Sequence, residues 1–217
     1  MKKFELTNEF ITNMFGTKLF RIRALVEFGD VEAGELGGYV EKESNLGHDD
    51  NAWVYDNAWV SGDALVYGNA RVYGNAWVHG DAQVSGDARV YGNAWVYGDA
   101  QVSGDARVYG NARVYGNAWV YGNAWVYGNA LVCSDEDYAY AHGFGSVNRT
   151  TTFFRLKDGG VGVRCGCFYG TLAQFRDKIR ETHGETKKAQ EYLMLADLME
   201  LRFEEDENEV GNRKYVE

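Results

Sequence analysis

Proline is absent from the 217 residues, and cysteine is scarce, with only three residues at Cys133, Cys165 and Cys167. A proline removes a backbone donor from a ladder of paired strands, so its absence fits strands that are hydrogen-bonded on both sides. An odd and low cysteine count argues against the disulfide framework of a small secreted protein. No secretory signal pattern and no run of about eighteen apolar residues occurs, so we expect a cytoplasmic protein without a membrane partner.

Basic charge is in deficit. The chain has 22 Lys and Arg against 32 Asp and Glu, which gives a net charge of −10. An acidic protein is not drawn to nucleic acid or to an anionic membrane by its overall field, so a nucleic-acid partner is not expected. The most acidic stretch covers residues 204–209, and we expect it to be a solvated end of the chain.

Glycine, by contrast, is abundant, and much of it belongs to a six-residue repeat. Fourteen consecutive units of the form Asn/Asp-Ala-x-Val-x-Gly fill residues 51–134, with glycine replaced only at Asp56 and Ser134. Alanine and valine are two residues apart in every unit, so they share one face of a short strand, which must be the buried face. The Gly-Asn and Gly-Asp pairs favour turns. Stacked coils would therefore bury a continuous column of valine and alanine.

The other side chains of the repeat recur every third unit, so 18 residues complete one coil of a three-sided column. Their positions predict three outward faces. We call them the Arg/Tyr face (Trp53, Tyr55, Arg71, Tyr73, Arg89, Tyr91, Arg107, Tyr109), the Trp face (Trp59, Trp77, His79, Trp95, Tyr97, Tyr115) and the Gln/Ser face (Gln83, Ser85, Gln101, Ser103). The corner before the Trp face is asparagine in every coil, which predicts a stacked ladder of amides.

The repeat rhythm continues into the flanking segments. Val40 and Leu46 are six residues apart, as are Val132, Tyr138 and Phe144, so we expect about one further coil at each end. Alternation over residues 19–25 predicts strands that cap the open N-terminal edge. After residue 148, the segments 151–157 and 161–167 flank Asp158-Gly159-Gly160 as in a hairpin, and helices are expected over about 171–182 and 186–203.

The expected fold is mainly β. It consists of an N-terminal β cap over residues 1–36, a three-sided parallel β-helix over 37–148 and a C-terminal ββαα cap domain over 149–217.

The repeat and the segment before it resemble the YdcK group of hexapeptide-repeat proteins. The motifs are FGDVEAGELGGYV at 28–40, Asn45-Leu46 and WVYDNA at 53–58, and the resemblance covers roughly residues 17–134. It implies a left-handed parallel β-helix of the kind found in phages and prophages, in a bacterial cell or a phage-infected host. The group's nominal label implies an acetyltransferase. Cys165-Gly166-Cys167-Phe168, Gly170-Thr171 and Thr182-His183-Gly184 resemble a small C-terminal appendage of unknown activity in the same phage-borne proteins.

The Arg/Tyr face is the candidate ligand site. Arg71, Arg89 and Arg107 should lie one coil apart, flanked by Tyr73, Tyr91 and Tyr109. Three cations beside aromatic rings could hold an anionic or nucleotide-like ligand, with the rings as stacking surfaces. The alternative is that Asp87 and Asp105 neutralise the neighbouring arginines and that the guanidinium planes stack on the tyrosines.

The Trp face is the candidate oligomer interface. Trp59, Trp77, Trp95 and Tyr97 would form an exposed aromatic strip, and contiguous apolar surface of that size usually marks an interface. Relatives on the fold that the resemblance implies commonly pack as trimers, so a homotrimer is expected. The C-terminal helices or another protein could cover the strip instead.

Candidates for catalysis and metal binding are few. A histidine is the usual general base of acyltransferases on this fold, and only His79 and His142 are candidates here. The four histidines lie in separate regions, which argues against a three-histidine zinc site. Cys165 and Cys167, expected on the same side of one strand, could bind a metal with His183 or be redox-active, although free cysteine also packs as a small buried hydrophobe.

The sequence therefore predicts a non-catalytic, self-associating scaffold without a metal or cofactor, which presents the Arg/Tyr face to a small anionic ligand or a host protein. The alternative is an acyltransferase of the hexapeptide-repeat superfamily that uses acetyl-CoA.

Overall fold

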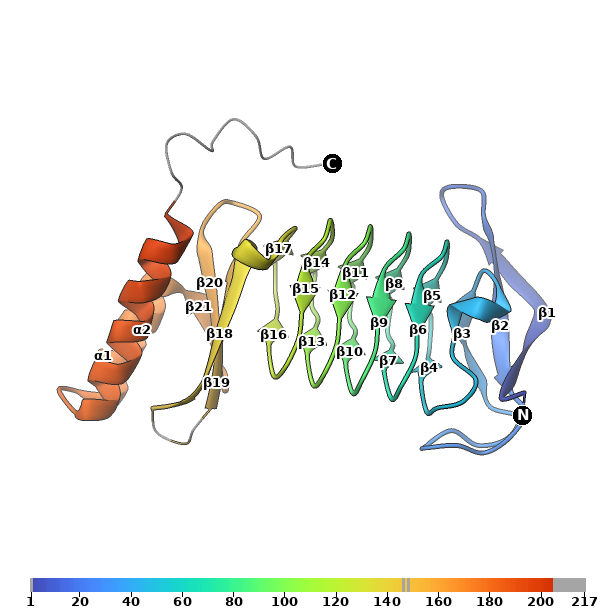
Figure 1. The fold of residues 1–217 in the computed structure, drawn as a ribbon, viewed down its shortest axis with the longest axis horizontal. Helices are drawn as coiled ribbons and strands as arrows, with labels where there is room; N and C mark the ends of the chain where they lie inside the picture. The colour runs from blue at the N-terminus through green and yellow to red at the C-terminus, as the bar shows by residue number, and fades with distance from the viewer. Residues whose placement is uncertain (1, 146, 148, 205–217) are drawn as a thin grey trace.

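The computed structural model describes residues 2–145, 147 and 149–204. The chain forms an elongated column of stacked coils between an N-terminal β cap and a C-terminal sheet with two helices (Figure 1). The coils contain fourteen strands of two residues each. These are β4 (Trp53–Val54), β5 (Trp59–Val60), β6 (Leu65–Val66), β7 (Arg71–Val72), β8 (Trp77–Val78), β9 (Gln83–Val84), β10 (Arg89–Val90), β11 (Trp95–Val96), β12 (Gln101–Val102), β13 (Arg107–Val108), β14 (Arg113–Val114), β15 (Trp119–Val120), β16 (Trp125–Val126) and β17 (Leu131–Val132).

Each coil contributes one strand to each of three parallel sheets that run along the column. The strand orders are β4-β7-β10-β13-β16, β5-β8-β11-β14-β17 and β6-β9-β12-β15. Neighbours in a sheet are 18 residues apart, as in the pairs Arg89 with Arg107 and Trp77 with Trp95. The 18-residue period is therefore confirmed, whereas the left-handed winding stays a prediction from the resemblance.

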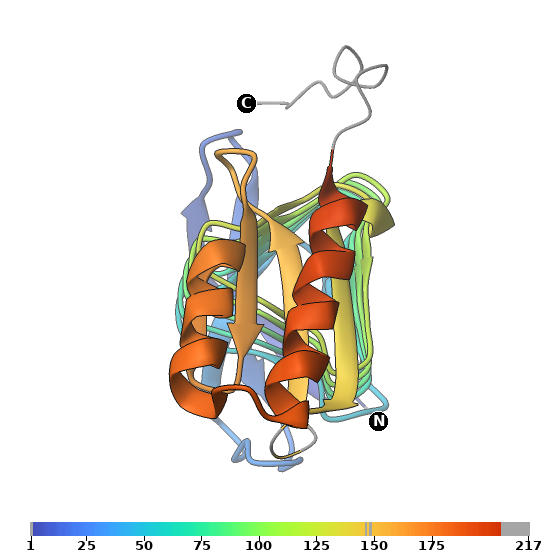
Figure 2. The ribbon, with the colours of Figure 1, turned by 90° about the vertical axis from the view of Figure 1, so that its left-hand side faces the viewer.

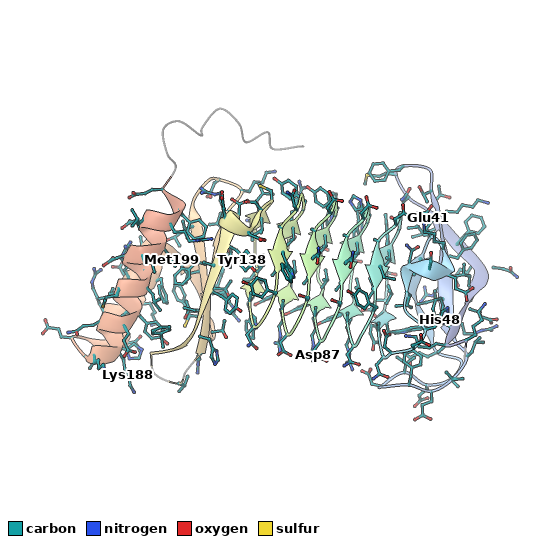
Figure 3. All side chains as sticks on the ribbon, viewed as in Figure 1. Glu41, His48, Asp87, Tyr138, Lys188 and Met199 are labelled. Atoms are coloured by element: carbon teal, nitrogen blue, oxygen red, sulfur yellow. The ribbon has the colours of Figure 1, made fainter. Side chains whose placement is uncertain are left out.

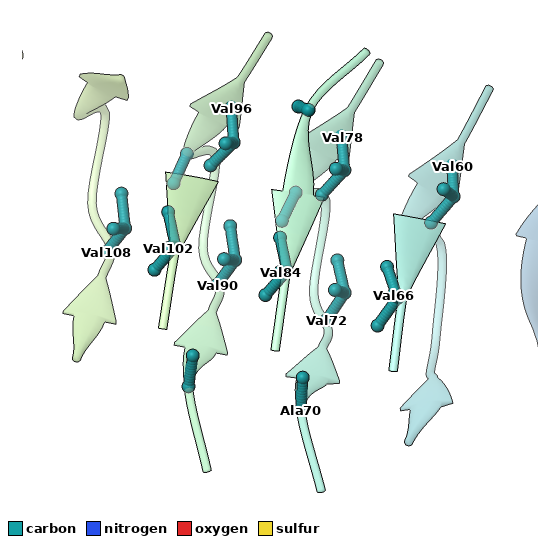
Figure 4. Packing of buried hydrophobic residues seen from close by; sticks show 14 of the residues in the cluster. Val60, Val66, Ala70, Val72, Val78, Val84, Val90, Val96, Val102 and Val108 are labelled. Carbon is teal, nitrogen blue, oxygen red and sulfur yellow. The ribbon is translucent and has the colours of Figure 1, made fainter. Parts of the chain in front are cut away.

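Valine and alanine fill the interior of the column. The repeat valines are completely buried and the repeat alanines are at most 1% exposed, and the valines of successive coils lie above one another (Figure 4). Each buried valine stabilises the fold by roughly 1.5–3 kcal/mol relative to an exposed one. The prediction that valine and alanine share the buried face is confirmed.

The corners of the coils require glycine for two reasons. Gly86 has a φ of +66°, which side chains disfavour, and an added Cβ would lie 2.9 Å from the backbone nitrogen of Gly104 in the next coil. Asp56 adopts the same positive φ, at 54°, and its carboxylate accepts a 2.9 Å hydrogen bond from the Gly74 backbone. The predicted amide ladder is present at another corner, where Asn75 donates to Asn93 and Asn93 to Asn111.

The N-terminal cap extends one of the solenoid sheets. Strands β1 (Phe4–Thr12), β2 (Lys18–Ala24) and β3 (Leu36–Val40) are antiparallel to one another, and β3 pairs in parallel with β5. Leu46 also bridges Val66 in parallel, after the short 3-10 helix η1 (Glu43–Asn45). The expected additional coil through Val40 and Leu46 is thus confirmed.

The prediction that the Trp53 side chain points into solvent is wrong. Its side chain is completely buried, with its ring in edge contact with Phe4 and Phe28, whose ring centroids are 6.1 and 5.3 Å away. The repeat points Trp53 out of its own coil, but the cap folds over that coil and encloses it.

The C-terminal unit is larger than predicted. Strands β18 (Tyr138–Phe144), β19 (Arg149–Arg155), β20 (Val161–Cys165) and β21 (Phe168–Thr171) form an antiparallel sheet, so the unit is ββββαα instead of ββαα. The expectation that the coils continue through Tyr138 and Phe144 is wrong, because Tyr138 pairs antiparallel with Phe154. The 3-10 helix η2 (Asp135–Asp137), capped by Ser134, turns the chain out of the column.

Two helices complete this unit and cover one face of the sheet (Figure 2). They are α1 (Leu172–His183), with Thr171 as its N-cap, and α2 (Lys187–Phe203), with Thr186 as its N-cap. Both helices are confirmed to within about one residue. Of the acidic stretch 204–209, all but Glu204 lies outside the described residues.

Candidate functional site

The three arginines of the Arg/Tyr face lie in register on successive coils. Arg89 is the direct strand partner of both Arg71 and Arg107. Parallel strands in a sheet are about 4.8 Å apart, so the three side chains form a regular row of positive charge. The predicted alignment of the arginine row is present in the structure.

The tyrosines form a second row beside the arginines. The rings of Tyr73 and Tyr91 are 4.7 Å apart and those of Tyr91 and Tyr109 are also 4.7 Å apart, with interplanar angles of 3° and 8°. The ring faces are therefore occupied by one another and offer a ligand no stacking surface between coils. Burial raises the pKa of Tyr91 to about 12. The hydroxyl edges of this row remain protonated hydrogen-bond donors at neutral pH.

An acidic side chain closes the N-terminal end of the arginine row. Asp30, in the loop between β2 and β3, accepts hydrogen bonds of 2.8 Å from Arg71 and 3.0 Å from the Tyr55 hydroxyl. The loop and the column form an open pocket of about 220 Å³, lined by these three residues with Asp56, Tyr73 and Arg89. Arg71 is thus compensated by an acid from outside the repeat.

A fourth arginine joins the other end of the row. The guanidinium of Arg107 lies 4.7 Å from the Trp125 ring centroid, and that of Arg164, on β20, lies 5.4 Å from the same ring. Arg164 is also 5.7 Å from the Tyr127 ring. The sequence analysis missed Arg164 because it lies outside the repeat, and nothing in its local sequence shows that β20 is placed beside the last coils.

Arg89 and Arg107 have no acidic partner in the part of the chain that the structure describes. Asp87, the neighbour expected to neutralise Arg89, accepts a 3.1 Å hydrogen bond from Asn69. No ion pair joins Arg89 or Arg107 to an acid among residues 2–145, 147 and 149–204. The structure therefore leaves the central and C-terminal parts of the row positively charged.

The Trp face is also built from stacked rings. The ring centroids of Trp59 and Trp77 are 4.0 Å apart and those of Trp77 and Trp95 are 4.5 Å apart, and Arg113 lies 4.9 Å from the Trp95 ring. The tryptophans are half-buried by this stacking. Tyr115, expected to point into solvent, is only 8% exposed.

The repeat is similar to a known family model. Residues 64–80, 82–98, 100–114, 106–122 and 112–128 match the family model of the YdcK β-solenoid repeat. The solenoid consists of YdcK-like repeats. No curated protein matches it. The matched segments of the YdcK-like solenoid begin at residue 64 and end at residue 128, so the cap and the C-terminal unit are outside them.

The two candidate catalytic histidines lie on different parts of this YdcK-like protein. His79 is on the Trp face, with its ring stacked 5.1 Å from Tyr97, and burial lowers its pKa. His142 is on β18, where its Nδ1 lies 3.0 Å from the Thr150 hydroxyl. The structure therefore does not unite them in one site.

The candidate metal ligands lie on different elements of the fold. Cys165 ends β20 and Cys167 follows Gly166, whose φ of +58° turns the chain into β21, so the expectation that both cysteines share one strand is wrong. Cys165 accepts a 3.2 Å hydrogen bond from the Thr151 hydroxyl, while His183 packs on Tyr192 with ring centroids 5.9 Å apart. Among the residues with described positions, no cluster of three His, Cys, Asp or Glu side chains could hold a metal.

Neither helix in the described part of the chain has the length and apolar character needed to cross a membrane.

Proposed function

We propose that this YdcK-like protein is a binding scaffold whose Arg/Tyr face holds an anionic ligand or the acidic surface of a partner protein. The observation that carries the proposal is the direct opposition of Arg89 and Arg107, neither of which pairs with an acid in the described part of the chain. Like charges opposite each other across paired strands are destabilising. An anion bound between them would remove that repulsion.

The centre of the site lies toward the C-terminal end of the row. Asp30 compensates Arg71, whereas Arg164 adds positive charge beside Arg107. The hydroxyls of Tyr91 and Tyr109, in the row beside the arginines, can donate to the same ligand. Guanidinium groups bind carboxylates and phosphates through two parallel hydrogen bonds. A ligand with two or more negative charges therefore fits this site better than a monoanion.

Calorimetric titration with tripolyphosphate tests the proposal. The double variant Arg89→Gln/Arg107→Gln should bind at least about 100-fold more weakly, since loss of each of the two charge-assisted contacts costs about 1.5–3 kcal/mol. Arg180→Gln is the matched control, because Arg180 is an exposed arginine on α1 that pairs with Asp177. Equal binding by the double variant and the wild type would remove the proposal, and binding should weaken as salt is raised.

Self-association through the Trp face is part of the same proposal. The continuous row Trp59, Trp77 and Trp95, with Tyr97 beside it, supports it, because aromatic side chains are enriched in interface cores. Light scattering should give about three times the 24.4 kDa mass of one chain. Trp95→Glu should lower that mass, and a wild-type mass of one chain would contradict the trimer.

One observation favours the acyltransferase alternative. His79 lines a pocket of about 350 Å³ on the Trp face, and burial lowers its pKa, so it is neutral at pH 7 as a general base must be. A thermal shift with acetyl-CoA that disappears in His79→Ala would support an enzyme. No shift with acetyl-CoA would exclude this alternative.

A further inference from the structure

A row of side chains beside the tryptophans of the Trp face lacks a ring at Ser61. Each of its members follows the buried valine of its coil, and in chain order they are Glu41, Ser61, His79, Tyr97, Tyr115 and Cys133. The rings of His79 and Tyr97 stack at 5.1 Å and those of Tyr97 and Tyr115 at 5.0 Å. Ser61 has no ring, so the stack ends at His79, two coils from Glu41.

The missing ring leaves a pocket. It has a volume of about 350 Å³ and is lined by Glu41, Ser61 and His79, by Trp59 and Trp77, and by Phe15 from the turn between β1 and β2. The Phe15 ring lies 6.5 Å from the His79 ring and forms an outer wall. Figure 3 labels Glu41 at the N-terminal end of the column. Glu41 and His79 are two coils apart, so roughly 9–10 Å separates their backbones.

The pocket has an uncompensated negative charge. Glu41 accepts a 2.6 Å hydrogen bond from the Gly62 backbone through one carboxylate oxygen. No cation pairs with it in the described part of the chain, since the neighbouring Lys42 is bound to Asp63 at 2.5 Å. Burial lowers the pKa of His79, so this ring is uncharged at pH 7 and does not offset the carboxylate.

We propose that this pocket binds a guanidinium group, which stacks on the His79 ring in the place left by Ser61 and donates hydrogen bonds to Glu41. A guanidinium is planar, stacks on aromatic faces and matches a carboxylate with two parallel donors, whereas an ammonium is a compact and strongly hydrated charge. A group in the place of Ser61 would lie one coil spacing from the His79 ring. The Glu41 carboxylate reaches the same coil, where it accepts the hydrogen bond from Gly62, so it can meet the edge of that group.

The protein already ends aromatic rows in this way. Arg113 lies 4.9 Å from the ring of Trp95, the last tryptophan of its row, and Arg21 lies 5.2 Å from the ring of Tyr39. Arg21 and Arg113 thus flank the Tyr39–Trp95 row of the same sheet. The row that ends at His79 has no such arginine in the described part of the chain, so an external guanidinium would take that position.

The test uses N-acetyl-L-arginine amide and its neutral isostere N-acetyl-L-citrulline amide, titrated into the full-length protein at constant ionic strength. The arginine probe should bind at least about ten-fold more tightly than the citrulline probe. Methylguanidinium distinguishes two sources of the group. If methylguanidinium binds as tightly as the arginine probe, the natural ligand is a small guanidino compound. If methylguanidinium binds more weakly, the ligand is an arginine side chain of a peptide. Equal binding of the arginine and citrulline probes overturns the inference.

Two variants locate the binding. Glu41→Gln keeps an acceptor for the Gly62 backbone and removes the charge. It should weaken binding of the arginine probe about ten-fold. Ser61→Tyr fills the gap with the ring that the row carries elsewhere, so it should abolish binding without loss of folding. Ser85→Tyr, at the corresponding position of the Gln/Ser face, is the control and should bind as the wild type does. Unchanged binding in Ser61→Tyr contradicts the proposed place.

Discussion

Asp30 and Arg71 connect the N-terminal cap to the repeat, with a hydrogen bond of 2.8 Å between carboxylate and guanidinium. Asp30 lies in the loop between β2 and β3, whereas Arg71 belongs to the second coil of the Arg/Tyr face. The pair is partly exposed, with 35% of the Arg71 side chain and 55% of the Asp30 side chain accessible to solvent. It therefore contributes little to stability. Its effect is to determine which arginines remain uncompensated.

Asp30→Asn should release Arg71 for anion binding. We expect tripolyphosphate to bind about 3–10-fold more tightly, because one more uncompensated cation, worth about 1 kcal/mol or more, faces the ligand. Calorimetric titration measures this change. Asp63→Asn removes the same charge from the Lys42 pair on another part of the surface and serves as the control. Unaltered affinity in Asp30→Asn would show that Arg71 does not contact the ligand.

The stacked corners predict a difference between two glycines of positive φ. Gly86→Ala places a Cβ 2.9 Å from the backbone of Gly104, whereas Gly159→Ala, at a φ of +85°, meets nothing within 4 Å. Both substitutions cost roughly 1–2 kcal/mol for the left-handed backbone. Gly86→Ala should cost about 1–3 kcal/mol more for overpacking. Urea unfolding measures both free energies, and equal losses would contradict the close stacking of the corners.

A buried ion pair joins the C-terminal sheet to the last coil. Arg155 of β19 lies 3.3 Å from Asp137 of η2, and the two side chains are 5% and 1% exposed. Arg155→Met should destabilise the protein by about 3–5 kcal/mol, because it leaves a carboxylate buried without its cation. The exposed Arg180→Met should change stability by less than about 1 kcal/mol. If urea unfolding shows similar small losses for both, the pair does not hold this junction.

The pKa of His79 predicts a pH dependence of stability. Burial lowers the pKa in the folded protein below the ordinary 6.5. Between the two values the unfolded chain binds the proton more readily, so stability is lost as pH falls below about 6.5. His79→Gln lacks this loss. From pH 8 to pH 5 the free energy of unfolding of the wild type should therefore fall relative to that of the variant. A difference between the two proteins that stays constant with pH would contradict the burial of His79.

Much of the solenoid could be predicted from sequence because every coil repeats the same six-residue pattern of buried, exposed and turn residues. Ala88 and Val90 are two residues apart and face inward wherever the unit occurs, and Arg89 lines up with Arg107 because 18 residues complete a coil. The prediction was wrong where a segment outside the repeat covers a coil, and where the chain leaves the column although the sequence spacing continues. Trp53 is buried by the cap, and Tyr138 pairs with Phe154 although its spacing continues the rhythm.

The candidate sites divide in the same way. The arginine and tyrosine rows follow from periodicity, but their chemistry depends on Asp30 and Arg164, which the cap and β20 bring from outside the repeat. The guanidinium pocket depends on Phe15, a residue 46 positions before Ser61 in the chain.

By itself, the sequence determined the coil, its buried valines and the order of side chains on each face, because a six-residue unit encodes strand, face and corner locally. Only the tertiary structure decided which charges are compensated, which rings are covered and where pockets form. Those properties arise from contacts between segments far apart in the chain, and a local repeat contains no information about them.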